Sequence, residues 1–181
     1  MKTLYLIRHT TPDIAPGICY GQLDIDVADS FANEAHDVLR YLPPLQLILT
    51  SPLQRTRRLA EHLAQAQHCE LRSDARLLEK NFGIWEGKAW DDIARGEIDA
   101  WADDFMGYAA QGGESAQQVM QRVQNLLGEV AQLPQKNIAL VAHAGSIRAM
   151  LALMGEVALA DILQWEVGYG AVIGVRGSSH N

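Results

Sequence analysis

Arginine and histidine side chains follow apolar runs in two distant parts of the sequence. Arg8 and His9 come directly after the run 4–7, and His143 comes after the run 138–142. A charged residue placed directly after a buried segment needs a partner or a ligand. In open α/β sheets, ligands bind at the carboxyl ends of the strands, so the two histidines are expected to meet in one crevice. The sequence therefore predicts an anion site beside a candidate nucleophile.

Arg55 is a third candidate, because it lies in the first turn of a predicted helix and can reach back over the ends of the strands. The N-terminal end of a helix attracts anions and disfavours cations. An arginine at this position is therefore favourable when a bound anion lies between its guanidinium group and the helix end. Taken alone, such an arginine is more commonly an ordinary surface residue, as the neighbouring Arg57 and Arg58 illustrate.

Phosphate is the anion that makes best use of these groups. The guanidinium groups of Arg8 and Arg55 offer rigid forks to phosphate oxygens, and neutral imidazole can attack phosphorus to form a phosphohistidine. An acid must then protonate the departing alcohol. It is expected within residues 77–87, where Glu79 and Glu86 lie among large apolar side chains that would raise the pKa of a carboxyl group. The residues alone favour Glu79 only weakly over Glu86.

The elements that must position these groups alternate between short apolar runs and helical periodicity, a pattern typical of an α/β sheet with covering helices. Strands are expected at 4–7, 45–49, 70–72 and 138–142, with one or two more within 162–175. Helices are expected at 31–42, from 51 onward, from 115 to about 133, and at 145–154. Ser51 is expected to cap its helix with Pro52 in the first turn, and Ser115 is expected to form a capping box with Gln118.

Composition and charge fit one globular domain over residues 1–181, because 48% of the residues are hydrophobic and can build a full core. The net charge of −7 argues against a nucleic-acid partner, which needs a concentrated basic face. No apolar run reaches the length of a signal-peptide core or a membrane span, so cytoplasmic residence without a membrane partner is expected. Cys19 and Cys69 have no metal-ligand or redox spacing.

Five motifs resemble, in order, those of the histidine phosphatase superfamily, the phosphoglycerate mutase-like group. They are found at 8–10, 51–55, 78–87, 112–115 and 141–145. The resemblance implies a three-layer α/β/α sandwich with a mostly parallel central sheet, His9 as the phosphorylated nucleophile and Glu79 as the proton donor. It also implies a phosphate pocket made by Arg8, Arg55 and His143, and it implies no metal or other cofactor.

Within the superfamily, residues 8–13 and 17–24 resemble the α-ribazole phosphatase branch, which removes phosphate from α-ribazole 5′-phosphate during cobalamin assembly. Many other members have glycine directly after the catalytic histidine, where this chain has Thr10, so their contacts cannot be transferred to residues 10–15. The alternative is a broad-specificity sugar-phosphate phosphatase or a phosphoglycerate mutase with the same site. Mutases of the family are generally longer, which favours hydrolysis.

Two features are expected to bear on the choice of a small phosphomonoester substrate. Gln22 is either a turn residue or a substrate contact beside the phosphate. The segment 81–113 holds Trp85, Trp90 and Trp101 and is expected to cover the site as a lid, where its rings could stack on a planar base. The same rings fit a simpler role, which is to pack the lid against the sheet.

Two interpretations from other classes stay open. In a metal-dependent hydrolase, His9, His143 and a carboxylate such as Glu79 or Asp24 would bind zinc. The adjacent Arg8 opposes a divalent cation, and the sequence has no His-x-x-x-His pair. In a non-catalytic binder of phosphorylated ligands, the same residues would hold phosphate without cleaving it, and the complete set of candidate catalytic groups argues against this.

Overall fold

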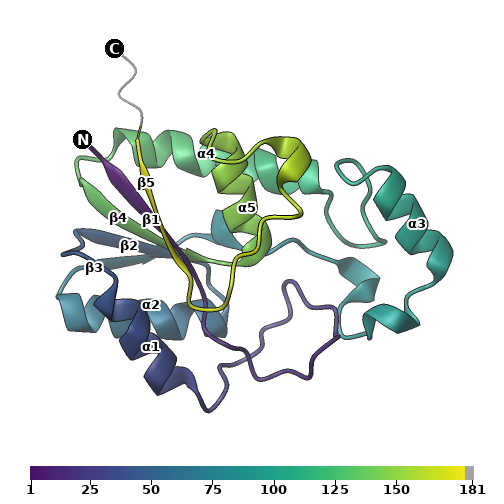
Figure 1. Cartoon of the computed structure of the whole chain (residues 1–181), viewed down its shortest axis with the longest axis horizontal. Coiled ribbons are helices and arrows are strands. Elements are labelled where there is room, and N and C mark those ends of the chain that lie inside the picture. The colour runs from purple at the N-terminus through teal and green to yellow at the C-terminus, as the bar shows by residue number, and fades with distance from the viewer. Residues whose placement is uncertain (178–181) are drawn as a thin grey trace.

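The computed structural model describes residues 1–177, which form a five-stranded sheet with helices on both faces (Figure 1). The strands are β1 (Thr3–Arg8), β2 (Leu47–Thr50), β3 (Glu70–Ser73), β4 (Asn137–Ala142) and β5 (Val172–Arg176). The helices are α1 (Phe31–Arg40), α2 (Gln54–Gln67), α3 (Arg95–Asp103), α4 (Ala116–Gln132) and α5 (Ala144–Leu153). The strand order is β3-β2-β4-β1-β5, and only β5 runs antiparallel to its neighbour. This is the α/β/α sandwich with a mostly parallel sheet that the sequence predicts.

The apolar runs of the central strands supply two cores, one on each face of the sheet. Leu6 and Leu140 pack with residues of α4 and α5, whereas Ile7 and Val141 pack with residues of α1 and α2. Figure 1 shows these two pairs of helices on opposite sides of the sheet. Successive residues of a strand point to opposite faces, so a strand covered on both sides is apolar throughout rather than alternating.

Of the two helix starts at which a serine cap is predicted, one has the cap and the other does not. The capping box is confirmed, because Ser115 Oγ accepts a hydrogen bond from the Gln118 N–H and Gln118 Oε1 accepts one from the Ser115 N–H. The cap expected at Ser51 is wrong. Helix α2 begins only at Gln54, whose N–H donates to Asp24 Oδ1 at 2.7 Å, while the Ser51 hydroxyl hydrogen-bonds to a histidine ring instead.

The segment that precedes β5 is a turn and not a further strand. The Ala171 N–H donates to the Gly168 carbonyl at 3.1 Å, and Gly170 has a φ of +69°, a conformation that glycine adopts without strain. Of the one or two strands expected within 162–175, the structure has only β5, which starts at Val172. Among the described residues, no helix has the length and hydrophobicity needed to cross a bilayer.

The segment 81–113 contains α3, which the sequence analysis did not predict, and lies to one side of the sheet (Figure 1). Its aromatic rings build a small third core with Cys19 and Ile93. Trp85 is its centre, with 1% of its surface exposed and ring centroids of Trp101 and Tyr108 at 5.8 Å and 5.7 Å. Trp85 thus packs within a core of this segment's own, whereas the sequence analysis expected these rings to pack against the sheet.

Candidate active site

His9 follows the last residue of β1 and has only 1% of its surface exposed. Its Nδ1 donates a hydrogen bond to the Thr10 carbonyl oxygen at 2.7 Å. An imidazole that carries its proton on Nδ1 presents a lone pair on Nε2. Burial, followed by the charges of Arg55 and Arg8, lowers the pKa of His9 to about 3, so the ring is neutral at pH 7. His9 thus has the protonation state that a nucleophile needs.

His143 follows the last residue of β4, the strand that pairs in parallel with β1. Because Arg8 is in register with Ala142, the two histidines leave the sheet side by side, with ring centroids 5.3 Å apart. The Nε2 of His143 lies 2.9 Å from Ser51 Oγ, close enough for a hydrogen bond. Complete burial, together with the nearby charges, holds the pKa of His143 well below its usual value. The two histidines thus meet at the carboxyl ends of neighbouring strands, as the sequence predicts.

Arg55 and Arg8 are anchored by main-chain carbonyls. The Arg55 guanidinium is fully buried and donates to the carbonyls of Gly21 at 2.5 Å and Leu23 at 2.6 Å. Arg8 donates from Nη1 to the Val167 carbonyl at 2.5 Å. The structure therefore makes Arg55 an interior residue and not the surface arginine that it resembles when taken alone.

Four buried polar atoms next to His9 have no hydrogen-bond partner among residues 1–177. They are Nε of Arg8, Nε of Arg55, Nδ1 of His143 and Oγ1 of Thr10. An unpaired buried polar group costs free energy, so such groups are rarely left without a role. The three nitrogens carry, or can carry, a proton and so can donate N–H hydrogen bonds to a bound anion.

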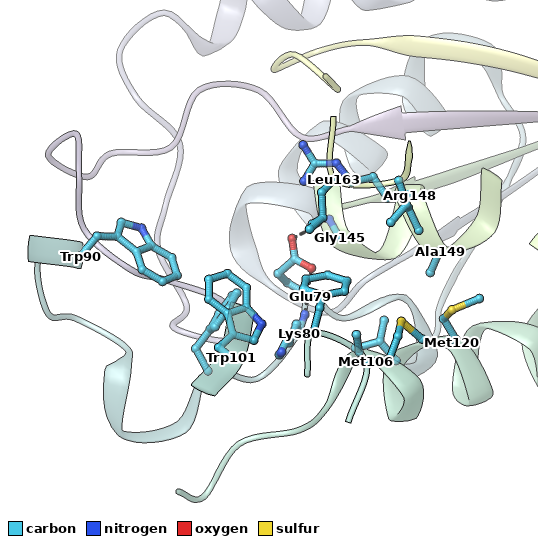
Figure 2. A pocket seen from close by; sticks show the side chains of 15 residues that line it. Glu79, Lys80, Trp90, Trp101, Met106, Met120, Gly145, Arg148, Ala149 and Leu163 are labelled. Carbon is cyan, nitrogen blue, oxygen red and sulfur yellow. Dashed lines mark hydrogen bonds between the residues drawn. The ribbon is translucent and has the colours of Figure 1, made fainter. Parts of the chain in front are cut away.

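Glu79 is held beside this group of side chains. Its Oε2 accepts a hydrogen bond from the Gly145 N–H at 3.0 Å, in the first turn of α5, and its Oε1 accepts one from the Lys80 N–H at 2.8 Å (Figure 2). The main-chain carbonyl oxygen of Glu79 accepts hydrogen bonds from Arg122 Nη2 at 3.1 Å and from Gln22 Nε2 at 3.0 Å. Since α5 starts directly after His143, these contacts tie the carboxylate to the histidine pair.

Glu86, the competing carboxylate, is occupied elsewhere. It accepts hydrogen bonds from the main-chain N–H groups of Gln22, Leu23 and Phe82, at 2.9 Å, 2.7 Å and 3.0 Å. These contacts engage both of its oxygens with main-chain groups of residues 22, 23 and 82. Its contacts instead fix the loop whose carbonyls hold Arg55. The structure thus favours Glu79 more strongly than the sequence does.

Gln22 has contacts with the protein that fit a positioning role, since its side chain donates to the Glu79 carbonyl. Its expected contact with substrate stays a prediction. In the described part of the chain, no three His, Cys, Asp or Glu side chains are grouped closely enough to hold a metal ion. The grouping that the zinc interpretation needs, with His9, His143 and one carboxylate, is thus not found there.

A cavity of about 250 Å³ opens next to Glu79 and Gly145 (Figure 2). Its walls are mainly aromatic and aliphatic, and they include Phe82, Trp90, Trp101, Phe105, Met106, Met120 and Leu163. Two cations also line it, Lys80 and Arg148. The Lys80 ammonium lies 5.5 Å from the ring centroids of both Phe82 and Trp101, and burial lowers its pKa. The cavity has room for a flat or apolar group, and it borders the histidine pair through Glu79 and Gly145, since Arg8, His9, Arg55 and His143 are not among its lining residues.

Sequence reasoning missed both cations and two tyrosines. Arg148 comes three residues after Gly145 on a predicted helix, so helical spacing could have found it. Tyr169 lies over Arg8, with 4.1 Å from Cζ to the ring centroid, and Tyr20 lies over Arg55 at 5.2 Å. Nothing in the sequence indicates that Tyr169, near the far end of the chain, would reach the first strand.

The fold and the paired histidines define a class, and the chain belongs to the histidine phosphatase superfamily (branch 1), whose sequence profile matches residues 4–180. It is 30% identical over 163 residues to phosphoserine phosphatase 1 of Hydrogenobacter thermophilus, across 86% of this chain and 77% of that protein. It is thus similar to phosphatases of this superfamily along most of its length.

Solved structures show the same fold. A mycobacterial glucosyl-3-phosphoglycerate phosphatase in complex with inorganic phosphate matches with a TM-score of 0.82 and 29% identity, over 96% of this chain and 89% of that one. A candidate alpha-ribazole-5′-P phosphatase from Escherichia coli matches with a TM-score of 0.87, over 96% and 89% of the two chains. The identity to the latter is 22%, so this likeness shows the fold alone.

Proposed function

We propose that the chain is a cytoplasmic phosphomonoesterase that works through a phosphohistidine and acts on α-ribazole 5′-phosphate in cobalamin assembly. One observation carries the chemistry. A neutral, buried His9 with a free Nε2 lies next to two arginines and a histidine whose inner nitrogens have no partner within residues 1–177. This arrangement supports a site for a phosphoryl group and an attacking atom together.

In the first step, His9 Nε2 attacks phosphorus while Arg8, Arg55 and His143 offset the charge on the phosphoryl oxygens. The bond from phosphorus to the ester oxygen breaks, and that oxygen takes a proton from the Glu79 carboxyl group. In the second step, the Glu79 carboxylate takes a proton from water, and the water oxygen bonds to phosphorus. The Nε2–P bond then breaks and releases inorganic phosphate, with both residues restored.

The cavity beside Glu79 supports the proposed substrate. The alcohol leaves on the side of the proton donor, so the body of the substrate is expected to lie next to Glu79, where Phe82, Trp90 and Trp101 form an aromatic wall. Aromatic side chains favour stacked or edge-to-face contacts with planar rings, such as the benzimidazole of α-ribazole phosphate. The lid role of residues 81–113 belongs to this proposal.

A second candidate is favoured by Lys80 and Arg148, which place two cations in the same cavity. They would pair with a carboxylate on the alcohol part of a substrate. Phosphoserine and glucosyl-3-phosphoglycerate, named for two of the similar proteins, both carry one. A broader phosphatase for such substrates would use the same chemistry at His9.

The substrate test compares kcat/KM for α-ribazole 5′-phosphate, phosphoserine and 3-phosphoglycerate in wild type and in Lys80→Met. The proposal expects a preference of at least about tenfold for α-ribazole 5′-phosphate, which Lys80→Met leaves in place. A preference for the carboxylated substrates that disappears in Lys80→Met would instead establish the second candidate. Loss of activity in EDTA that added zinc restores would support the metal-dependent alternative.

The nucleophile test uses p-nitrophenyl phosphate and the variant His9→Ala. We expect turnover to fall by about four orders of magnitude or more and the acid-labile phosphoenzyme to disappear, because no other group replaces the attacking nitrogen. His36→Ala, which removes an exposed histidine on α1, serves as the matched control. Turnover that survives in His9→Ala would show that the nucleophile is another residue. A wild type that binds phosphate without turnover would be the non-catalytic binder.

A further inference from the structure

Two tyrosine side chains meet above the histidine pair. The hydroxyl groups of Tyr20 and Tyr169 lie 3.1 Å apart and share a hydrogen bond. The ring of Tyr169 also lies against His9, with centroids 5.7 Å apart. Tyr20 comes from the loop after β1, and Tyr169 comes from the turn before β5, so the pair joins two segments that are distant in the sequence. The tyrosine pair therefore spans the site from Arg8 to Arg55.

The reactive groups are covered in this conformation. His9, Arg55 and His143 expose 1% or less of their surfaces, although the proposed chemistry requires a phosphoryl group to reach all three. The tyrosine rings occupy the guanidinium faces of Arg8 and Arg55, while Tyr169 itself is 44% exposed. The tyrosines therefore stand between the solvent and the groups that would bind phosphate.

We propose that Tyr20 and Tyr169 form a gate over the phosphate pocket, held shut by the hydrogen bond between their hydroxyl groups and opened when a phosphomonoester enters. This inference rests on the proposed function, since it takes the His9 pocket to be the phosphate site. Neither tyrosine is assigned a chemical step. Both act by controlling access to Arg8, Arg55 and His9.

The gate opens by rotation of side chains, because the backbone on both sides is anchored. Cys19, next to Tyr20, exchanges two main-chain hydrogen bonds with the segment 87–88, both at 2.8 Å. On the other side, Gly170 donates to the His9 carbonyl at 3.0 Å, and the Val167 carbonyl accepts from Arg8. Rotamer changes of an exposed side chain such as that of Tyr169 are fast compared with turnover, so such a gate costs affinity and not speed.

The apparent affinity for phosphate falls as the fraction of protein with a closed gate rises. A ligand that binds only the open state has its apparent affinity reduced by the fraction of protein that is open. A single hydrogen bond of this kind changes such an equilibrium by roughly two- to tenfold. Burial, followed by the hydrogen bond to Tyr169, raises the pKa of Tyr20, so this phenol keeps its proton at neutral pH.

The test measures the affinity for inorganic phosphate by calorimetry in Tyr20→Phe, Tyr169→Phe and the double variant. Phenylalanine keeps the ring over each arginine and removes only the hydroxyl. We expect each single variant to bind phosphate two- to tenfold more tightly, and the double variant to gain no more than either single, because all three break the same bond. For p-nitrophenyl phosphate, KM should fall by the same factor with kcat unchanged. Tyr41→Phe, which removes the hydroxyl of an exposed tyrosine outside the pair, is the control.

Weaker phosphate binding in the single variants would show that the hydroxyls are ligands of the phosphate and would overturn the gate. Unchanged affinity, or gains that add in the double variant, would also overturn it. These results differ from a failure of the proposed function, which would appear as a wild type that neither binds phosphate nor turns over p-nitrophenyl phosphate. That outcome would remove the basis of both proposals.

Discussion

Glu79 shows how the main chain around a side chain can fix its position. Both of its oxygens accept N–H groups, from Lys80 and Gly145, and its carbonyl is fixed by Arg122 and Gln22. A carboxyl group whose position is set this tightly needs little reorganisation when a proton moves. The neighbouring Glu86 has the same chemistry, but its three main-chain contacts give it a different task.

At the residue scale, Glu79→Gln is expected to slow the enzyme in proportion to how poor the leaving group is. Alkyl phosphates such as α-ribazole 5′-phosphate should lose about 10²- to 10⁴-fold in kcat, because the alkoxide needs a proton as it leaves. p-Nitrophenyl phosphate, whose leaving group is a stable anion, should lose least. Steady-state rates with both substrates check this, with Glu61→Gln on α2 as an exposed control. Equal losses for both substrates would assign Glu79 a role other than proton donation.

At the scale of elements, the start of α5 joins the two halves of the site. It begins directly after His143, and the second residue of the helix, Gly145, touches the Glu79 carboxylate. A Cβ on Gly145 would lie only 2.2 Å from Glu79 Oε1. Glycine at this position therefore sets how closely Glu79 can approach the helix.

Gly145→Ala is expected to displace the Glu79 carboxylate and reduce kcat for alkyl phosphates by about tenfold or more, since an acid must lie within hydrogen-bond reach of the oxygen it protonates. Gly128→Ala in α4 is the matched control, because nothing lies within 4 Å of its added Cβ. The control should keep full activity and raise the free energy of unfolding by about 0.5–1 kcal/mol. Full activity in Gly145→Ala would mean that the contact with Glu79 is dispensable. Rate assays and chemical denaturation measure both effects.

At the scale of the whole molecule, the strand ends could be predicted, whereas the contributions from loops could not. Arg8, His9 and His143 follow apolar runs that only buried strands explain, and parallel strands bring their carboxyl ends to one edge. Tyr169 depends on how the turn before β5 packs over Arg8 and His9, and Lys80 depends on how its loop packs against Phe82 and Trp101, which no local pattern records. The cap expected at Ser51 was wrong for the same kind of reason, because α2 begins only at Gln54 and Asp24, from a distant loop, accepts its first N–H.

The buried histidines should also govern the stability of the whole fold in acid. The pKa of His9 is about 3 in the folded protein, against an ordinary value of 6.5, so between these values the unfolded chain binds a proton that the folded chain does not. The free energy of unfolding therefore falls as the pH falls from 6.5, by up to about 1.4 kcal/mol per pH unit for one such histidine. His143, whose pKa is also lowered, adds a contribution of the same sign.

Urea denaturation of wild type and His9→Asn between pH 4 and pH 7 measures this contribution. The variant should show a shallower loss of stability below pH 6.5, and the two proteins should run parallel above it, where His9 is neutral in both states. Identical slopes at acidic pH would show that His9 titrates in the folded protein much as it does in the unfolded chain.

The main-chain anchors of the site have a consequence for how it can diversify. Arg8 is held by the Val167 carbonyl, Arg55 by those of Gly21 and Leu23, and His9 by that of Thr10. Every amino acid supplies the same carbonyl group, so an exposed side chain such as that of Leu23 can be exchanged while Arg55 keeps its anchor. Substitution at such a position can then change the surface around the site while the arginine and histidine side chains stay where they are.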